Sequence, residues 1–309
     1  MLVSMSSTPQ EGARPRPFEE PASVGDPRLD ELARLGAVVD RLRDPDGGCP
    51  WDLEQSVESM APSLVEEAHE CVEAIETEGD AEARGELGDV LLVCFVIARI
   101  AEQNGRFDLG SAARAASDKL LRRHPHVFGD ADAADRPHAL ENWERAKRSE
   151  QGAEGRRKSA VDGVPLAMPA LQRTYRIGHK AVAAGFRWNG PSGALAKLRE
   201  ELGELEQELA AAGLEEGSSE LPPEAPRQRI QEELGDVLLA AAQLGTYLEL
   251  DPERALRDAL RRFEGRFRLV EQELGEDLQG ASLDRIRAAW ARAKQGLQSA
   301  APEADPAQT

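Results

Sequence analysis

Two groups of acidic residues recur along this chain with the same internal order, and their spacing could hold a metal ion. Each group has two adjacent glutamates, a third glutamate three residues later, and then a more distant Glu-x-x-Asp pair. Residues three or four apart share one face of a helix, so facing helices could bring these carboxylates into one pocket. Hard cations such as Mg²⁺ prefer oxygen ligands of this kind and commonly bring phosphates with them. The first group is Glu66, Glu67, Glu70, Glu86 and Asp89, and the second is Glu200, Glu201, Glu204, Glu233 and Asp236.

A solvated helix surface is the simpler interpretation of any single glutamate-rich segment. Here both elements of the pattern return in the same register in each half of the chain. A solvated surface has no reason to keep residue type and register together, although a recent duplication alone could preserve them. The repetition therefore favours two metal-binding pockets.

Helices are the elements that must position these carboxylates. Apolar residues such as Leu64, Cys71 and Ile75 recur at helical spacing beside the first glutamates, and no alternating segment of strand length stands out. The predicted fold class is therefore all-α. Gly88 and Gly235 fall inside two of the predicted helices, where a glycine costs about 1 kcal/mol relative to alanine. We expect these glycines to allow the close approach of another helix or of a ligand.

Internal repetition predicts a tandem duplication of helical-bundle units. Trp51 and Trp143 bracket the first acidic group, and Trp188 and Trp290 bracket the second. Composition then predicts the boundaries: a disordered extension at 1–27, a first unit at 28–147, a linker at 148–165, a second unit at 166–296 with a flexible insertion at 213–227, and a disordered tail at 297–309.

Composition also limits the classes of partner. The 309 residues carry a formal net charge of −19, which opposes non-specific binding to nucleic acid or to an anionic membrane. The three cysteines have no paired spacing, as expected for reduced thiols. No segment is long and apolar enough to span a bilayer, and the polar, proline-rich start is unlike a signal peptide. We therefore expect a cytoplasmic protein.

Basic residues cluster at matching places after each acidic group, where they could bind the phosphates of a substrate. Two matching Trp-x-x-x-Lys segments are grouped with them. The tryptophans could instead be packing anchors, and the basic clusters could be solvent-facing charge. The candidate substrate-binding residues are Lys119, Arg122, Arg123, Trp143 and Lys147 in the first half, and Arg262, Arg266, Trp290 and Lys294 in the second.

Taken as a set, these motifs resemble the MazG family of all-α nucleoside triphosphate pyrophosphohydrolases. The acidic signature is accompanied by Gly48–Asp52 (GCPWD), Arg84–Asp89 (RGELGD), Arg122–Phe128 (RRHPHVF) and Gly185–Trp188 (GFRW). The resemblance covers residues 28–296 in a two-repeat arrangement. It implies a four-helix core in each unit and a homodimer. It also implies Mg²⁺-dependent hydrolysis of NTPs and dNTPs to nucleoside monophosphate and pyrophosphate, as nucleotide-pool housekeeping.

The resemblance further implies a role for each acidic residue. Glu66 and Glu200 would bind metal or orient the attacking water. Mn²⁺ could replace Mg²⁺ at the same ligands. The implied metal ligands are Glu67, Glu70, Glu86 and Asp89 in the first unit, and Glu201, Glu204, Glu233 and Asp236 in the second.

Two alternative functions stay open at this point. A non-catalytic helical module could use the same metal sites to bind nucleotide or to dock a regulatory partner. A narrower pyrophosphatase of the same superfamily would act on dUTP or on phosphoribosyl-ATP. The intact acidic groups favour catalysis, and the tandem architecture favours broad specificity.

Overall fold

Helices make up the whole of the regular structure that can be described. The computed structural model describes residues 22–129, 159–214 and 222–300, with six further positions between residues 135 and 146. Every regular element among these residues is a helix, which confirms the predicted all-α fold class. Residue contacts divide the chain into two units, Met1–Gly155 and Arg156–Thr309. Among the described helices, none has an apolar stretch long enough to cross a lipid bilayer.

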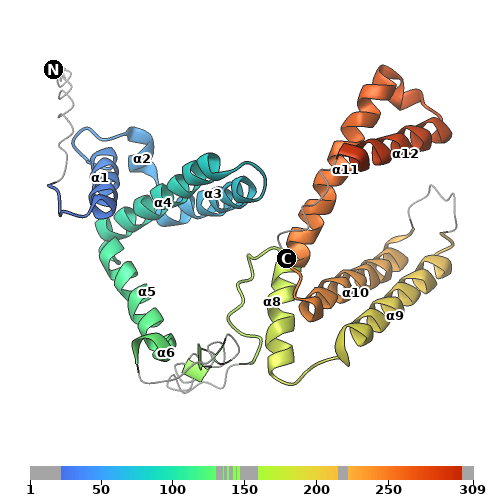
Figure 1. Cartoon of the computed structure of the whole chain (residues 1–309), viewed down its shortest axis with the longest axis horizontal. Helices are drawn as coiled ribbons and strands as arrows, with labels where there is room; N and C mark the ends of the chain where they lie inside the picture. The colour runs from blue at the N-terminus through green and yellow to red at the C-terminus, as the bar shows by residue number, and fades with distance from the viewer. Residues whose placement is uncertain are drawn as a thin grey trace, which may run out of the picture. The chain divides into compact units, whose positions relative to one another are not determined.

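The first unit is built on an antiparallel hairpin of two long helices, α3 (Val57–Thr77) and α4 (Asp80–Gln103) (Figure 1). Ser56 begins α3 as its N-cap and exchanges two hydrogen bonds with Ser59, which satisfies backbone N–H groups that the first helical turn leaves unpaired. Gly79 joins the two helices with a φ of 123°, a backbone conformation that glycine adopts without strain.

The other helices of the first unit are attached at the end of the hairpin that lies away from Gly79. Helix α1 (Pro27–Leu42) packs on α4, with the short α2 (Pro50–Glu54) after it. Helix α5 (Leu109–Arg123) leaves the end of α4 with every residue up to Arg122 exposed, and the short α6 (Pro125–Phe128) follows. The buried core joins α1, α3 and α4 and consists of Val39, Met60, Val93, Val96 and Ile100.

The second unit repeats this arrangement. Helices α9 (Gly190–Ala211) and α10 (Glu224–Leu248) form its hairpin, and α8 (Ala170–Ala183) packs on α10. Gly178 of α8 permits this packing, because a Cβ there would lie 2.5 Å from Thr246 Oγ1.

The second unit ends in a helix pair that has its own small core. Helix α11 (Pro252–Leu274) leads through the 3₁₀ turn η1 (Gly275–Gly280) into α12 (Leu283–Ala300), which folds back on α11. The core of this pair consists of Val270, Leu274, Ala289 and Ala293.

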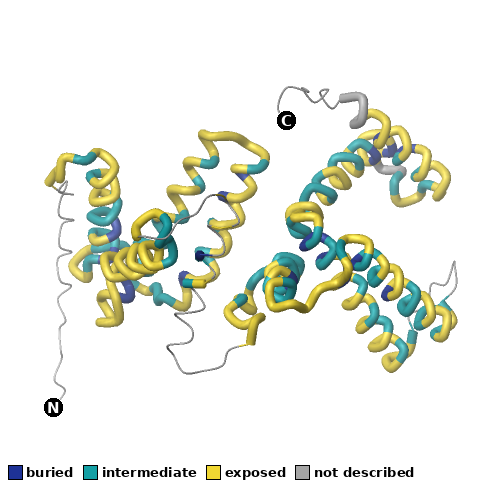
Figure 2. The backbone as a smooth tube through the Cα atoms, turned by 60° about the horizontal axis from the view of Figure 1, so that its bottom comes forward, coloured by how far each residue is buried: buried dark blue, intermediate teal, exposed yellow. Residues whose placement is uncertain are grey.

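Four long helices therefore follow in the same order in each unit, as the predicted duplication requires. They do not close around a single core, because α5 stands apart from the α3–α4 hairpin and α11 packs mainly on α12. Exposed positions predominate along the helices of both units (Figure 2). Large apolar side chains are among them, including Leu87 at 53% exposure and Leu120 at 51%.

The described helices extend a few residues beyond the boundaries that composition suggested. Helix α1 begins at Pro27, and Ser23 before it donates a hydrogen bond to Asp30. Helix α10 begins at Glu224, inside the predicted insertion, and α12 extends to Ala300. Proline fits the first turn of a helix, where its missing N–H is not needed, so Pro27 begins α1 inside the segment predicted to be disordered. The rest of the predicted extension, linker, insertion and tail falls largely on 1–21, 148–158, 215–221 and 301–309, which lie outside the described residues.

Candidate metal centre

The α3–α4 hairpin brings three carboxylates of the first acidic group together. Glu67 and Glu70 lie one turn apart on α3, and Glu86 lies on the facing turn of α4. One carboxylate oxygen from each of these residues lies within 4.8 Å of the other two. We call Glu67, Glu70 and Glu86 the first acidic trio.

Repulsion among carboxylates dominates the electrostatics of the first trio. Partial desolvation, followed by the charges of Glu70 and Asp89, raises the pKa of Glu67 above its ordinary value. Desolvation and the same two charges raise the pKa of Glu86. Within the described part of the chain, no ion pair neutralises any member of the first trio. The site therefore favours a bound cation.

The α9–α10 hairpin forms a second acidic trio from Glu201, Glu204 and Glu233, with the same spacing of oxygens. Glu201 is buried, with 7% of its surface exposed. A hydrogen bond to Glu201, together with desolvation, raises the pKa of Glu204. Lys197, one turn before these glutamates on α9, donates to Glu200 Oε1 at 2.7 Å and forms an ion pair with Glu201 Oε1 at 2.7 Å. Sequence reasoning missed Lys197, although its i,i+3 and i,i+4 spacing to two glutamates was visible.

The four remaining acidic residues of the predicted site lie outside the two trios. Asp89 is nonetheless close enough to raise the pKa of both Glu67 and Glu86. Glu66 adds a smaller effect on Glu67. Glu200 is bonded to Lys197, and Asp236 is exposed on α10.

Both trios fit a small divalent cation. All six ligand candidates are carboxylates, the donor type that hard cations prefer. Two oxygen ligands on opposite sides of an Mg²⁺ ion are about 4.2 Å apart, which is twice the usual bond length. Oxygens that already lie within 4.8 Å of one another need only small side-chain adjustments to surround one ion.

The basic residues of the first unit are not brought to the first trio. Lys119 and Arg122 are exposed on α5, and Arg123 lies over the Trp143 ring at 5.3 Å. Helix α5 starts beyond the end of α4, and 17 residues of helix from Glu86 to Gln103 span about 25 Å. Lys147 lies outside the described residues.

The basic residues of the second unit lie on the α11–α12 pair. Arg262 and Lys294 are exposed, whereas Arg266 has a buried Nε with no hydrogen-bond partner among the described residues. Trp290 packs against Phe263 with ring centroids 5.2 Å apart, so here the tryptophan is a packing anchor.

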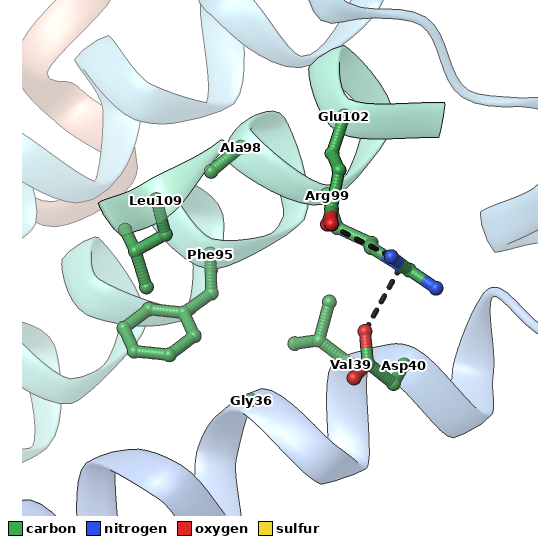
Figure 3. A pocket seen from close by; sticks show the side chains of 8 residues that line it. All are labelled: Gly36, Val39, Asp40, Phe95, Ala98, Arg99, Glu102 and Leu109. Atoms are coloured by element: carbon green, nitrogen blue, oxygen red, sulfur yellow. Dashed lines mark hydrogen bonds and ion pairs between the residues drawn. The ribbon is translucent and has the colours of Figure 1, made fainter. Parts of the chain in front are cut away.

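A pocket of about 170 Å³ lies between α1, α4 and the start of α5, and none of the first trio lines it (Figure 3). Phe95 and Leu109 form part of its apolar wall. Arg99 enters it and forms ion pairs with Asp40 at 2.9 Å and with Glu102 at 2.8 Å. Because these two carboxylates neutralise the guanidinium, the pocket has little attraction for a phosphate.

The close approach expected at the two helix glycines does not occur within either unit. A Cβ built on Gly88 or on Gly235 would have no described atom within 4 Å. The helix surface around each glycine is open, next to the exposed side chains of Leu87 and Leu234. Anything that approaches these glycines must come from outside the hairpin.

Known proteins are similar to this chain over most of its length. Residues 55–128 match the MazG nucleotide pyrophosphohydrolase domain. The chain is 36% identical over 269 residues to the nucleoside triphosphate pyrophosphohydrolase of Escherichia coli (strain K12), an alignment of 86% of this chain and 98% of that protein. It is also 36% identical over 265 residues to the nucleoside triphosphate pyrophosphohydrolase/pyrophosphatase MazG of Thermotoga maritima, covering 85% and 95% of the two chains. The uncharacterized protein YabN of Bacillus subtilis is 34% identical over 268 residues, with 52% of its own length covered.

Proposed function

This chain belongs to the MazG nucleotide pyrophosphohydrolase family, and we propose on that basis that it hydrolyses NTPs and dNTPs to nucleoside monophosphate and pyrophosphate with Mg²⁺. One observation carries the proposal: each unit gathers three carboxylates on a helical hairpin, in a chain aligned with nearly the full length of two pyrophosphohydrolases. The cytoplasm, where nucleotide pools are held, is the location that this activity requires.

The acidic trios would hold the metal ion, and Asp89 and Asp236 would complete the ligands from the next turn of α4 and α10. A divalent cation supplies charge neutralisation on the phosphates and activation of water. Mn²⁺, which takes similar oxygen ligands, would substitute for Mg²⁺.

Glu66 and Glu200 would orient the attacking water and accept its proton. Both lie directly before a member of an acidic trio in the sequence and are exposed to solvent. A carboxylate that is not held among the metal ligands can still accept a hydrogen bond from a water molecule. In this proposal the trios hold the metal ion that neutralises charge on the phosphates, and Glu66 and Glu200 transfer the proton.

The reaction also requires positively charged side chains that bind the phosphates. In the first unit these side chains lie on α5, which starts beyond the end of α4, and that end is about 25 Å along the helix from Glu86. A second copy of the unit could supply them, and the exposed apolar side chains on α4 and α5 would then be covered. We therefore propose a homodimer in which equivalent units from two chains pack isologously.

The homodimer is expected to elute with about twice the monomer mass of 33.6 kDa in size-exclusion chromatography with light scattering. Burial of Leu87 and Leu120 against the partner supplies the hydrophobic driving force. Leu120→Glu should shift the mass toward that of the monomer, and Glu73→Gln on the exposed side of α3 is the control. A strict monomer at micromolar concentration that still hydrolyses NTPs would contradict this assembly.

Replacing Arg262 or Arg266 by alanine is expected to raise the KM and to lower kcat/KM of the second unit by about tenfold to a hundredfold. The reason is the loss of a charge-assisted contact to phosphate, which is worth about 1.5–3 kcal/mol. Arg268→Ala is the matched control, because Arg268 lies on the same helix but pairs with Glu264. Steady-state kinetics in a chain whose first trio is neutralised would measure the effect. An equal loss of Mn²⁺ binding without nucleotide would show that the two arginines maintain the fold instead.

A non-catalytic nucleotide-binding or regulatory module is the alternative from another class, and a pyrophosphatase restricted to dUTP or phosphoribosyl-ATP is the narrower alternative. A panel of NTPs, dNTPs and these two compounds, assayed for pyrophosphate release with Mg²⁺, separates all three. Release from many nucleotides supports the proposal. Release from one supports the narrow enzyme, and binding without release supports the module.

A further inference from the structure

Lys197 contacts the second acidic trio, and neither the proposed ligands nor the phosphate-binding residues account for it. Its Nζ lies 2.7 Å from Glu200 Oε1 and 2.7 Å from Glu201 Oε1. Glu201 belongs to the trio, and only 7% of its surface is exposed. The ammonium therefore binds a carboxylate that the metal ion would also need.

An ordinary ion pair along a helix surface is the simplest description of this contact, and such pairs contribute little to stability. The burial of Glu201 makes this pair different. Water competes weakly for a buried carboxylate, and screening by salt is reduced there. Lys197 also bonds two adjacent carboxylates at once, so it neutralises part of the charge that the trio concentrates.

The first unit has no equivalent of this lysine. Ser63 stands three residues before the glutamate pair of the first unit, as Lys197 stands three residues before that of the second. Serine has no charge, and none of the first trio has an ion-pair partner among the residues that the structure describes. The two candidate metal centres thus differ by one positive charge at a matched position.

We propose that Lys197 is a built-in counter-cation of the second site, which competes with the divalent ion for Glu201. The inference rests on the proposed function, because the metal ion is its competitor. A divalent ion at the second trio must displace the ammonium from Glu201 and also repels it. The first site has no such competitor. The second site therefore fills at a higher metal concentration than the first, and the two sites of one chain respond to different metal levels.

The test measures Mn²⁺ binding by titration calorimetry without nucleotide, in the full chain. Glu67→Gln and Glu70→Gln silence the first trio, so that only the second site binds. Adding Lys197→Met, which keeps the length but not the charge, is expected to tighten Mn²⁺ binding by about tenfold or more. This is the size of the water-screened repulsion between an ammonium and a divalent ion about 5 Å apart. Lys197→Arg keeps the charge and should leave the binding weak.

The mirror experiment places the charge in the other unit. Glu201→Gln and Glu204→Gln silence the second trio, and Ser63→Lys is then expected to weaken Mn²⁺ binding at the first site by about tenfold, whereas Ser63→Ala should not change it. This arm keeps the test decisive if Lys197→Met fails to fold.

Two outcomes would count against the inference, and they differ from each other. Unchanged or weaker Mn²⁺ binding in Lys197→Met, with the mirror variants also equal, would overturn the role of Lys197 and leave the proposed function intact. The absence of Mn²⁺ binding in both silenced parents would contradict the metal sites themselves, and with them the proposed function.

Discussion

Replacing Glu70 and Glu204 together by glutamine is expected to lower pyrophosphate release by at least about 100-fold, because even the loss of a residue that only supports a metal ligand costs 10–100-fold. Each residue belongs to one of the two acidic trios, so the double variant removes one proposed metal ligand from each unit. The helices should remain, because glutamine is a good helix former. Initial rates with Mg²⁺ and saturating ATP or dNTPs measure the effect, and circular dichroism verifies the fold.

The single variants measure how much of the activity each unit contributes. Glu70→Gln leaves only the second site, and Glu204→Gln leaves only the first, so the two residual rates give the share of each. Glu73→Gln and Glu206→Gln are matched controls, because both glutamates are exposed on the same helices outside the trios. A double variant that kept the wild-type rate would show that the reaction takes place elsewhere.

Mg²⁺ at about 100 times its Kd is expected to raise the melting temperature by about 5–10 °C. Ligand linkage gives about 2.7 kcal/mol at that concentration, and 1 kcal/mol corresponds to about 2–4 °C for a domain of this size. The physical cause is relief of the repulsion among clustered carboxylates. Differential scanning calorimetry with and without a chelator measures the shift. In the Glu67→Gln, Glu204→Gln variant the metal-free melting temperature should rise and the metal-induced shift should disappear.

The same repulsion determines how stability changes with pH in the absence of metal. The pKa values of Glu67 and Glu86 are raised above the ordinary value of 4.5, so the folded state binds protons more tightly than the unfolded state. Stability is therefore greatest below pH 4.5 as far as these groups are concerned, and it falls as the pH rises through the raised pKa values. A metal-free protein whose melting temperature rose through that window, with no difference in Glu67→Gln, would contradict a repulsive cluster.

The acidic trios could be predicted from the sequence because their geometry is local. Glu67 and Glu70 share a helix face by spacing alone. The short turn at Gly79 makes α4 fold back beside α3. The acidic residues outside the trios are harder to predict. Asp89, for example, raises the pKa of Glu67 through its charge but does not belong to the first trio. The role of each residue in catalysis stays a prediction.

The placement of α5 could not be predicted, because periodicity shows which face of a helix is apolar but not which partner covers it. Lys119 and Arg122 follow the first acidic group closely in the sequence. However, α5 begins at the end of the α3–α4 hairpin that lies away from Gly79. Lys197 was overlooked for another reason: a lysine among glutamates matches the pattern of a solvated helix. Only the burial of Glu201 distinguishes this lysine from a surface charge.

The location of each acidic trio on two consecutive helices has a consequence for how such proteins diverge. Copying the segment from α3 to α4 transmits the proposed metal-binding carboxylates in a single event, whereas the side chains proposed to bind phosphate lie on later helices. Drift in α5 or α11 can then alter which nucleotide is accepted while the inherited hairpin keeps its chemistry. One ancestral hairpin could in this way give rise to two descendants on the same chain, each free to specialise.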